Sequence, residues 1–169
     1  MIQSEERKER LLLVGIRQQD GDDTEDSLIE LKELVETAGG EPVGMVIQNR
    51  EKMHPGTYVG KGKAEEIRTM LSEYQADGIV CDDELSPAQL ANLSQTLDIK
   101  VMDRTLVILD IFAARASTSE GKIQVELAQL KYRQSRLTGF GRAMSRLGGG
   151  IGTRGPGEKK LEMDRRLIK

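Results

Sequence analysis

Apolar and polar residues alternate in blocks along the first hundred residues. Four short apolar runs are bounded by polar residues, which is typical of strands buried in a parallel sheet. They span residues 10–16, 42–48, 78–81 and 99–102. In the three segments between them, apolar residues recur at helical spacing. These segments cover residues 24–38, 64–74 and 86–97. The alternation predicts an α/β fold with a small open parallel sheet of about four strands, in the order 2-1-3-4, with helices on both faces.

Capping signals mark the ends of these helices. Residues 86–89 form the pattern of a capping box, with Ser86 as the cap and proline in the first turn, so a helix should start there. Asp23 is a candidate N-cap for the first helix, and the glycine pair at residues 39–40 should end it. The segment 49–63 is rich in glycine, and its apolar residues follow neither helical spacing nor the alternation of a strand, which predicts an irregular loop.

After residue 103 the pattern becomes helical throughout. The predicted helices span residues 104–115, 122–137 and 158–169. We therefore expect a parallel α/β subdomain over residues 1–103 and a helical subdomain over residues 104–169. In the latter, the last two helices should form a projecting antiparallel hairpin around a glycine-rich tip at residues 138–157. Because no stop signal precedes Lys169, we also expect a fragment that is truncated within a helix of a longer protein.

Charge is divided unevenly along the chain. Residues 1–120 hold 13 Lys and Arg against 24 Asp and Glu, a net −11, whereas residues 121–169 hold 12 against 4, a net +8. A basic segment on an acidic body predicts contact with a polyanion. The sequence has no apolar run near the roughly 18 residues that a membrane helix needs, and no signal-peptide pattern. With a single cysteine as well, we expect a cytoplasmic protein without a membrane span.

The segment 139–157 carries the strongest chemical signal. It contains eight glycines, three arginines and no acidic residue. So many glycines disfavour a helix or strand, and arginine without carboxylate neighbours suits bidentate binding of phosphate. We therefore predict an RNA-binding loop that is extended by cations of the flanking helices. The predicted RNA-binding residues are Lys131, Arg133, Arg136, Arg142, Arg146, Gly148, Gly149, Gly150, Gly152, Arg154, Gly155, Gly157, Lys159 and Lys160.

A second hypothesis is a small-ligand module at the carboxyl edge of the sheet. Gly60, Gly62 and Lys63 precede a helix, so their amides could hold an anion or a nucleotide phosphate. The acidic residues 82–84 follow a strand at the edge where open α/β sheets bind ligands, and they could hold Mg²⁺. A structural turn and a solvated loop are the alternatives for these two segments.

No catalytic or metal-ligating set is predicted. His54 is the single histidine, which excludes a histidine-rich metal site, and Cys81 reads as a buried strand residue. The sequence contains no G-x-x-x-x-G-K-[ST] phosphate loop, so the fragment should not hydrolyse GTP. Residues 103–104 should cap or pair locally, and Tyr132 should pack rather than stack on a base.

Four segments together resemble the N-terminal domain of the HflX family of ribosome-associated GTPases. They are residues 58–63 (YVGKGK), 81–87 (CDDELSP), 103–132 and 145–166 (SRLGGGIGTRGPGEKKLEMDRR). The resemblance covers about residues 10–169. Lys159 stands where the family usually has threonine, and it adds a cation at the base of the loop.

The resemblance implies a parallel α/β subdomain, two long antiparallel helices and, beyond this fragment, a GTPase domain that uses GTP and Mg²⁺. It implies no cofactor for the fragment itself. The implied partners are the RNA of the large ribosomal subunit and the protein's own C-terminal GTPase domain. The loop at about residues 138–157 would approach the peptidyl-transferase region, and binding would help to split or rescue stalled ribosomes.

Overall fold

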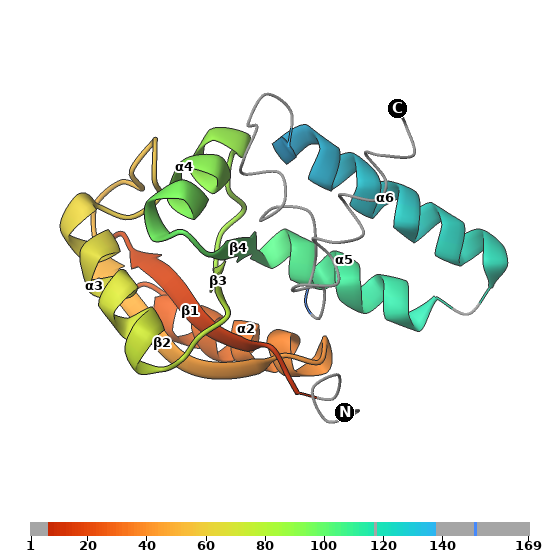
Figure 1. The fold of residues 1–169 in the computed structure, drawn as a ribbon, viewed down its shortest axis with the longest axis horizontal. Coiled ribbons are helices and arrows are strands. Elements are labelled where there is room, and N and C mark those ends of the chain that lie inside the picture. Colours follow the sequence, from red (N-terminus) through yellow and green to blue (C-terminus); the bar gives the residue numbers. More distant parts are fainter. Residues whose placement is uncertain (1–6, 117, 138–150, 152–169) are drawn as a thin grey trace.

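A computed structural model of the chain describes residues 7–116, 118–137 and 151 (Figure 1). Strands and helices alternate in it up to β4, after which two helices follow. The elements are β1 (Arg10–Arg17), α2 (Thr24–Thr37), β2 (Glu41–Asn49), α3 (Lys61–Glu73), β3 (Gly78–Cys81), α4 (Pro87–Leu97), β4 (Lys100–Asp103), α5 (Arg104–Arg115) and α6 (Ser119–Leu137).

The four strands form one parallel sheet in the order β2-β1-β3-β4, which confirms the predicted fold class and strand order. β1 lies inside the sheet, and its residues from Leu11 to Val14 are completely buried. Because side chains alternate across a strand, Leu12 and Val14 enter one core cluster, and Leu11 and Leu13 enter the other. Two separate apolar layers therefore exist, one on each face of the sheet.

Each face is covered by two helices (Figure 1). α3 and α4 contribute Ile67 and Leu93 to the layer that contains Leu12. α2 and α5 contribute Leu31 and Val107 to the opposite layer. The predicted helical covering of both faces is thus confirmed, and α5 shares the core of the sheet although it follows the last strand. The predicted division of the chain at residue 103 stays a prediction.

Two helices begin earlier than predicted, and one predicted capping bond is not formed. α3 begins at Lys61, inside the predicted loop. α6 begins at Ser119, because the hydroxyl of Thr118 accepts a hydrogen bond from the first-turn amide of Gly121 at 2.9 Å. Asp23 occupies the N-cap position of α2 without a side-chain cap bond. The capping box at Ser86 is present as predicted, and α4 starts there.

α5 and α6 lie side by side (Figure 1). Gln129 of α6 donates to Asp110 of α5 at 2.8 Å, and Tyr132 donates to Asp103, which caps α5. Because the later residue of α6 meets the earlier residue of α5, the two helices run in opposite directions. This pair is not the hairpin that the sequence predicts, whose second arm at 158–169 lies outside the described residues.

Candidate functional site

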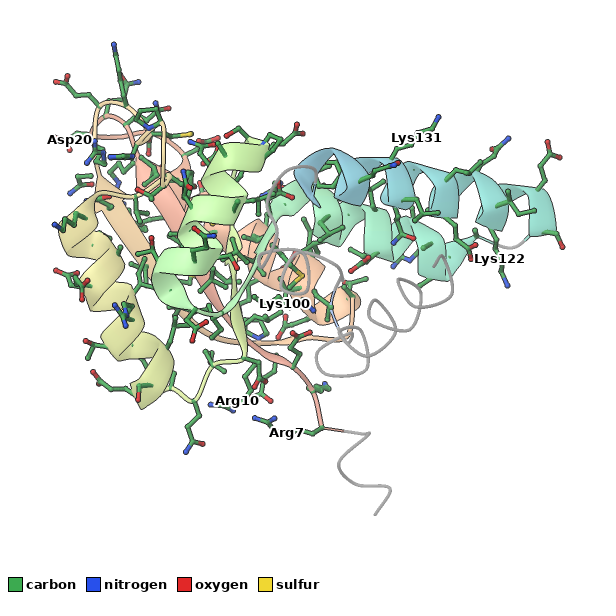
Figure 2. The ribbon with its side chains drawn as sticks, turned by 45° about the horizontal axis from the view of Figure 1, so that its top comes forward. Arg7, Arg10, Asp20, Lys100, Lys122 and Lys131 are labelled. Carbon is green, nitrogen blue, oxygen red and sulfur yellow. The ribbon has the colours of Figure 1, made fainter. Side chains whose placement is uncertain are left out.

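α6 carries the part of the predicted RNA-binding set that the structure describes. Lys131 is exposed, as is Lys122, and Figure 2 shows both projecting from α6 at the end of the molecule opposite Asp20. Arg133 and Arg136 belong to α6, but their side chains lie outside the described parts of the structure. The remaining predicted RNA-binding residues, from Arg142 to Lys160, also lie outside the described residues.

Asp103 fixes α6 to the end of the sheet. Its side chain is buried, with one carboxylate oxygen accepting from the amide of Leu106 at 3.1 Å and the other from the amide of Leu85 at 3.0 Å. The hydroxyl of Tyr132 donates to the second oxygen as well. The carboxylate therefore caps α5, holds the loop after β3 and anchors the helix that carries Lys131. This agrees with the capping and packing roles that the sequence predicts for Asp103 and Tyr132.

Ile151 is the described residue of the glycine-rich segment. Its backbone amide donates to Asp110 at 2.8 Å, and its side chain packs against the core layer beneath α2 and α5. Ile151 thus lies on the body of the protein. Sequence reasoning missed Ile151 and Asp110, because the contact joins residues 41 positions apart. An apolar residue between glycines was the available signal.

Asp82, at the carboxyl end of β3, is held by a cation. Its carboxylate lies 2.8 Å from the guanidinium of Arg104, which also contacts Glu30. Burial raises the pKa of Asp82, the Ser27 hydrogen bond opposes this, and nearby Asp83 adds to it. Burial also lowers the pKa of Arg104. Because the Asp82 carboxylate already forms a salt bridge with Arg104, it is poorly suited to bind Mg²⁺.

The side chain of Asp83 is hydrogen-bonded to Tyr58. The tyrosine hydroxyl donates to the Asp83 carboxylate at 2.6 Å, and the Tyr58 side chain is completely buried. Burial raises the pKa of Tyr58 far above its ordinary value, and its neighbours Cys81 and Asp83 raise it further, so the hydroxyl stays a donor. Tyr58 has a φ of 68°, an uncommon conformation for a non-glycine residue. The bond clamps the loop before α3 to the loop after β3.

The predicted anion-binding residues lie at the start of α3. The amide of Gly60 donates to the side chain of Gln48 at 2.8 Å, and the ammonium of Lys63 pairs with Glu66 at 2.8 Å. Gly62 faces open space. An anion would have to displace both Gln48 and Glu66 from these partners. The arrangement therefore stabilises the turn as it stands, and it offers little support for a nucleotide phosphate.

A shallow hollow lies at the carboxyl ends of β1 and β2. Arg17, Gln18, Asp20, Asn49 and Arg50 are among the residues that line it. The Arg17 guanidinium is paired with Glu25 at 2.7 Å. Within residues 7–116, 118–137 and 151, no group of three or more His, Cys, Asp or Glu side chains is suited to hold a metal ion.

In the part of the chain that the structure describes, no helix combines the length and apolarity that crossing a membrane requires.

Comparison with known proteins gives two family matches that together cover most of the chain. The family model described as GTP-binding GTPase N-terminal matches residues 25–113, and the one described as GTP-binding GTPase Middle Region matches residues 115–169. A protein named GTPase HflX from Lacrimispora saccharolytica is 67% identical over 168 residues, which are 99% of this chain and 40% of the relative. The protein of the same name from Escherichia coli is 46% identical over 161 residues, 95% of this chain and 38% of the relative. This chain thus spans about 40% of the length of these relatives.

Solved structures show the same fold. A GTP-binding protein from the hyperthermophilic archaeon Sulfolobus solfataricus, in complex with GDP, matches with a TM-score of 0.57 and 21% identity. The match covers 94% of this chain and 46% of the archaeal one. At that level of identity the likeness establishes the fold alone.

Proposed function

This chain belongs to the HflX family of GTPases, and we propose that it is the module with which such a protein binds the large ribosomal subunit, in order to split or rescue ribosomes. The glycine-rich segment at 138–157 contacts ribosomal RNA near the peptidyl-transferase region. Such a protein works in the cytoplasm.

The observation that carries the proposal is the separation of charge. Residues 1–120 have a net charge of −11 and residues 121–169 a net charge of +8. Lys122 and Lys131 are exposed on α6, which is the helix that leads into the glycine-rich segment. Cations gathered on one part of a chain bind the phosphates of a nucleic acid, and an acidic body is repelled from the same surface. The charge thus favours approach with α6 and the glycine-rich segment foremost.

We assign no GTP or Mg²⁺ site to the residues that the structure describes. The sequence has no phosphate loop, and the amide of Gly60 and the ammonium of Lys63 already have partners. We therefore assign nucleotide binding and hydrolysis to a separate GTPase domain of the longer protein, which is also a partner of this module. No catalytic step is assigned to the present residues.

Binding to isolated large ribosomal subunits tests the proposal. Replacing Arg142, Arg146 and Arg154 with alanine should weaken co-sedimentation strongly at low salt, because three phosphate contacts are lost. If about five phosphates are neutralised, log K should fall against log salt with a slope of roughly −3.5 to −4.5. The triple variant should have a slope that is shallower by about 2 to 3.

Three exposed cations of the body provide the matched control. Alanine at Lys8, Lys52 and Arg68 removes the same charge from residues outside the proposed interface. This control should keep the slope of the native chain. Equal losses in the two variants would show that net charge alone governs binding, and unchanged binding of the first variant would refute the role of the loop.

A further inference from the structure

The loop that follows β3 is bonded to three consecutive residues at the start of α5. We call residues 82–85 the β3 loop. β3 and β4 are parallel neighbours, so this loop and α5 leave the sheet at the same edge. The bonds join Asp82 to Arg104 at 2.8 Å, Glu84 to Thr105 at 3.0 Å and the amide of Leu85 to Asp103 at 3.0 Å. One bond fixes only a distance, whereas three bonds at successive residues restrain both the direction and the rotation of the first turn of α5.

Two further contacts fix the β3 loop and the start of α5 to the rest of the body. The guanidinium of Arg104 also contacts Glu30 of α2, the helix that shares a core layer with α5. Tyr58 donates to Asp83 of the β3 loop at 2.6 Å, which ties the loop to the segment before α3. The side chains of Arg104 and Asp82 are only 21% and 8% exposed, so salt screens this ion pair less than a surface pair.

α6 is bonded to α5 and therefore follows its direction. Gln129 of α6 donates to Asp110 of α5 at 2.8 Å. Tyr132 of α6 donates to Asp103, whose carboxylate also accepts from the amide of the β3 loop. The restraint at the start of α5 is thus passed on to the whole helix pair.

The direction of α6 decides where its cations lie relative to the acidic body. Lys122 and Lys131 project from α6 at the end of the molecule opposite Asp20 (Figure 2). Residues 1–120 have a net charge of −11, which repels phosphates that come close to the body. We propose that the β3 loop is a positioning element, which fixes the direction of α5 and α6 and so presents the cations of α6 to RNA away from the acidic body.

A loosened β3 loop should lower the affinity for RNA, although no contact with RNA is removed. Only the fraction of molecules in which α6 has the binding direction is competent, so the apparent dissociation constant is the intrinsic constant divided by that fraction. This inference rests on the proposed function, and two measurements separate them.

The test variant combines Arg104→Lys with Thr105→Val and keeps the net charge. Lysine lacks the planar fork with which arginine reaches two carboxylates, and valine lacks the hydroxyl that donates to Glu84. Arg68→Lys with Thr69→Val is the matched control, because it changes the same pair of residue types at exposed positions of α3. Thr105→Val alone removes a single exposed bond and is the milder second variant.

The first measurement is the distribution of distances between two spin labels in the free chain. One label is attached at Gln124→Cys on α6 and the other at Ser72→Cys on α3, both exposed positions, while Cys81 is completely buried and does not react. The distribution should be broader in the test variant than in the native chain, and less so in the milder variant. The matched control should keep the native width.

A second pair of labels reports on the body alone. Labels at Thr37→Cys on α2 and Ser72→Cys on α3 should give the same width in the native chain and in every variant, since the sheet and its covering helices stay folded. A loss of folding would broaden both pairs, whereas a loss of positioning broadens only the pair that includes α6.

The second measurement is the affinity for large ribosomal subunits at low salt. The test variant should bind about 3- to 10-fold more weakly than the native chain. The matched control should bind as the native chain does. Because both variants keep the net charge, a difference between them does not come from charge.

Each outcome bears on one of the two proposals. An unchanged distribution for the pair that includes α6 would overturn the restraint by the β3 loop. A broader distribution with native affinity, or equal weakening by the matched control, would overturn its role in RNA binding. If the native chain does not bind the subunits while the distribution broadens as expected, the proposed function is wrong and the β3 loop still fixes the direction of α6.

Discussion

At the scale of single residues, Asp103 joins three parts of the fold. Its buried carboxylate accepts from the amides of Leu85 and Leu106 and from the hydroxyl of Tyr132. A carboxylate that is removed from water needs such partners, and each donor in turn needs the carboxylate. The loop after β3, the start of α5 and the second half of α6 therefore depend on one side chain.

Removing one donor to the Asp103 carboxylate should lower the free energy of unfolding less than removing the carboxylate itself. Tyr132→Phe deletes one hydrogen bond and should lower the free energy of unfolding by about 1 kcal/mol. Asp103→Ala leaves two backbone amides and a hydroxyl without their acceptor and should cost about 3 kcal/mol or more. Urea denaturation measures both.

Tyr74→Phe is the matched control for the tyrosine, because Tyr74 is 41% exposed. It should change the free energy of unfolding by less than about 0.5 kcal/mol. If Tyr132→Phe costs no more than this control, the hydroxyl of Tyr132 does not help to hold α6.

At the scale of elements, local signals in the sequence were sufficient for the sheet and for most helices. The strand at Gly78–Cys81 and the capped helix after Ser86 were predictable, because burial and capping act over a few residues. The start of α3 was not, since Gly60 and Gly62 disguise its first turn as a loop. Helical spacing correctly predicted α6, but it did not show that Ile123, Leu127 and Leu130 would each be about half exposed.

Gly78 and Gly62 differ in the space that a side chain would find around them. A Cβ at Gly78 would lie 2.8 Å from the backbone oxygen of Lys100 in the neighbouring strand, whereas one at Gly62 in α3 would meet nothing within 4 Å. Gly78→Ala should therefore push β3 from β4 and lower the free energy of unfolding by about 1–3 kcal/mol.

Gly62→Ala is the matched substitution and should have the opposite sign. It should raise the free energy of unfolding by up to about 1 kcal/mol, because alanine favours a helix over the unfolded chain. Thermal or urea unfolding would measure both. Equal destabilisation by the two variants would contradict the described position of Gly62.

At the scale of the whole molecule, the candidate site was only partly predictable. The charges of residues 121–169 are visible in the sequence, and they predict a polyanion as the partner. The sequence did not reveal that Asp82 pairs with Arg104 and Asp83 with Tyr58, because these partners lie on other elements or loops, whereas Lys63 pairs locally with Glu66 within α3. Pairing within the fold thus weakens the small-ligand hypothesis.

The acidic body should affect binding through its electric field. Asp26, Glu33 and Glu36 are exposed on α2, and replacing them with Asn, Gln and Gln should tighten binding to the subunits by roughly twofold at low salt. The gain should fade near 0.15 M salt, where the Debye length is about 8 Å. Filter binding across a salt series would measure it.

The charge-preserving exchange of Asp26 for Glu and of Glu33 and Glu36 for Asp is the control, and it should leave binding unchanged. A gain that persists undiminished at high salt would point to a direct contact of α2 with the RNA instead of a long-range field.

β4 ends at Asp103 and α5 begins at Arg104, so no residue separates the last strand from the helix that follows it. Such a junction has no linker residue whose backbone could rotate independently of both elements. Any torque that a bound partner applies to α5 and α6 must therefore pass straight into the sheet as a twist of β4. A rotation of α5 and α6 would therefore be coupled directly to a rotation of β4.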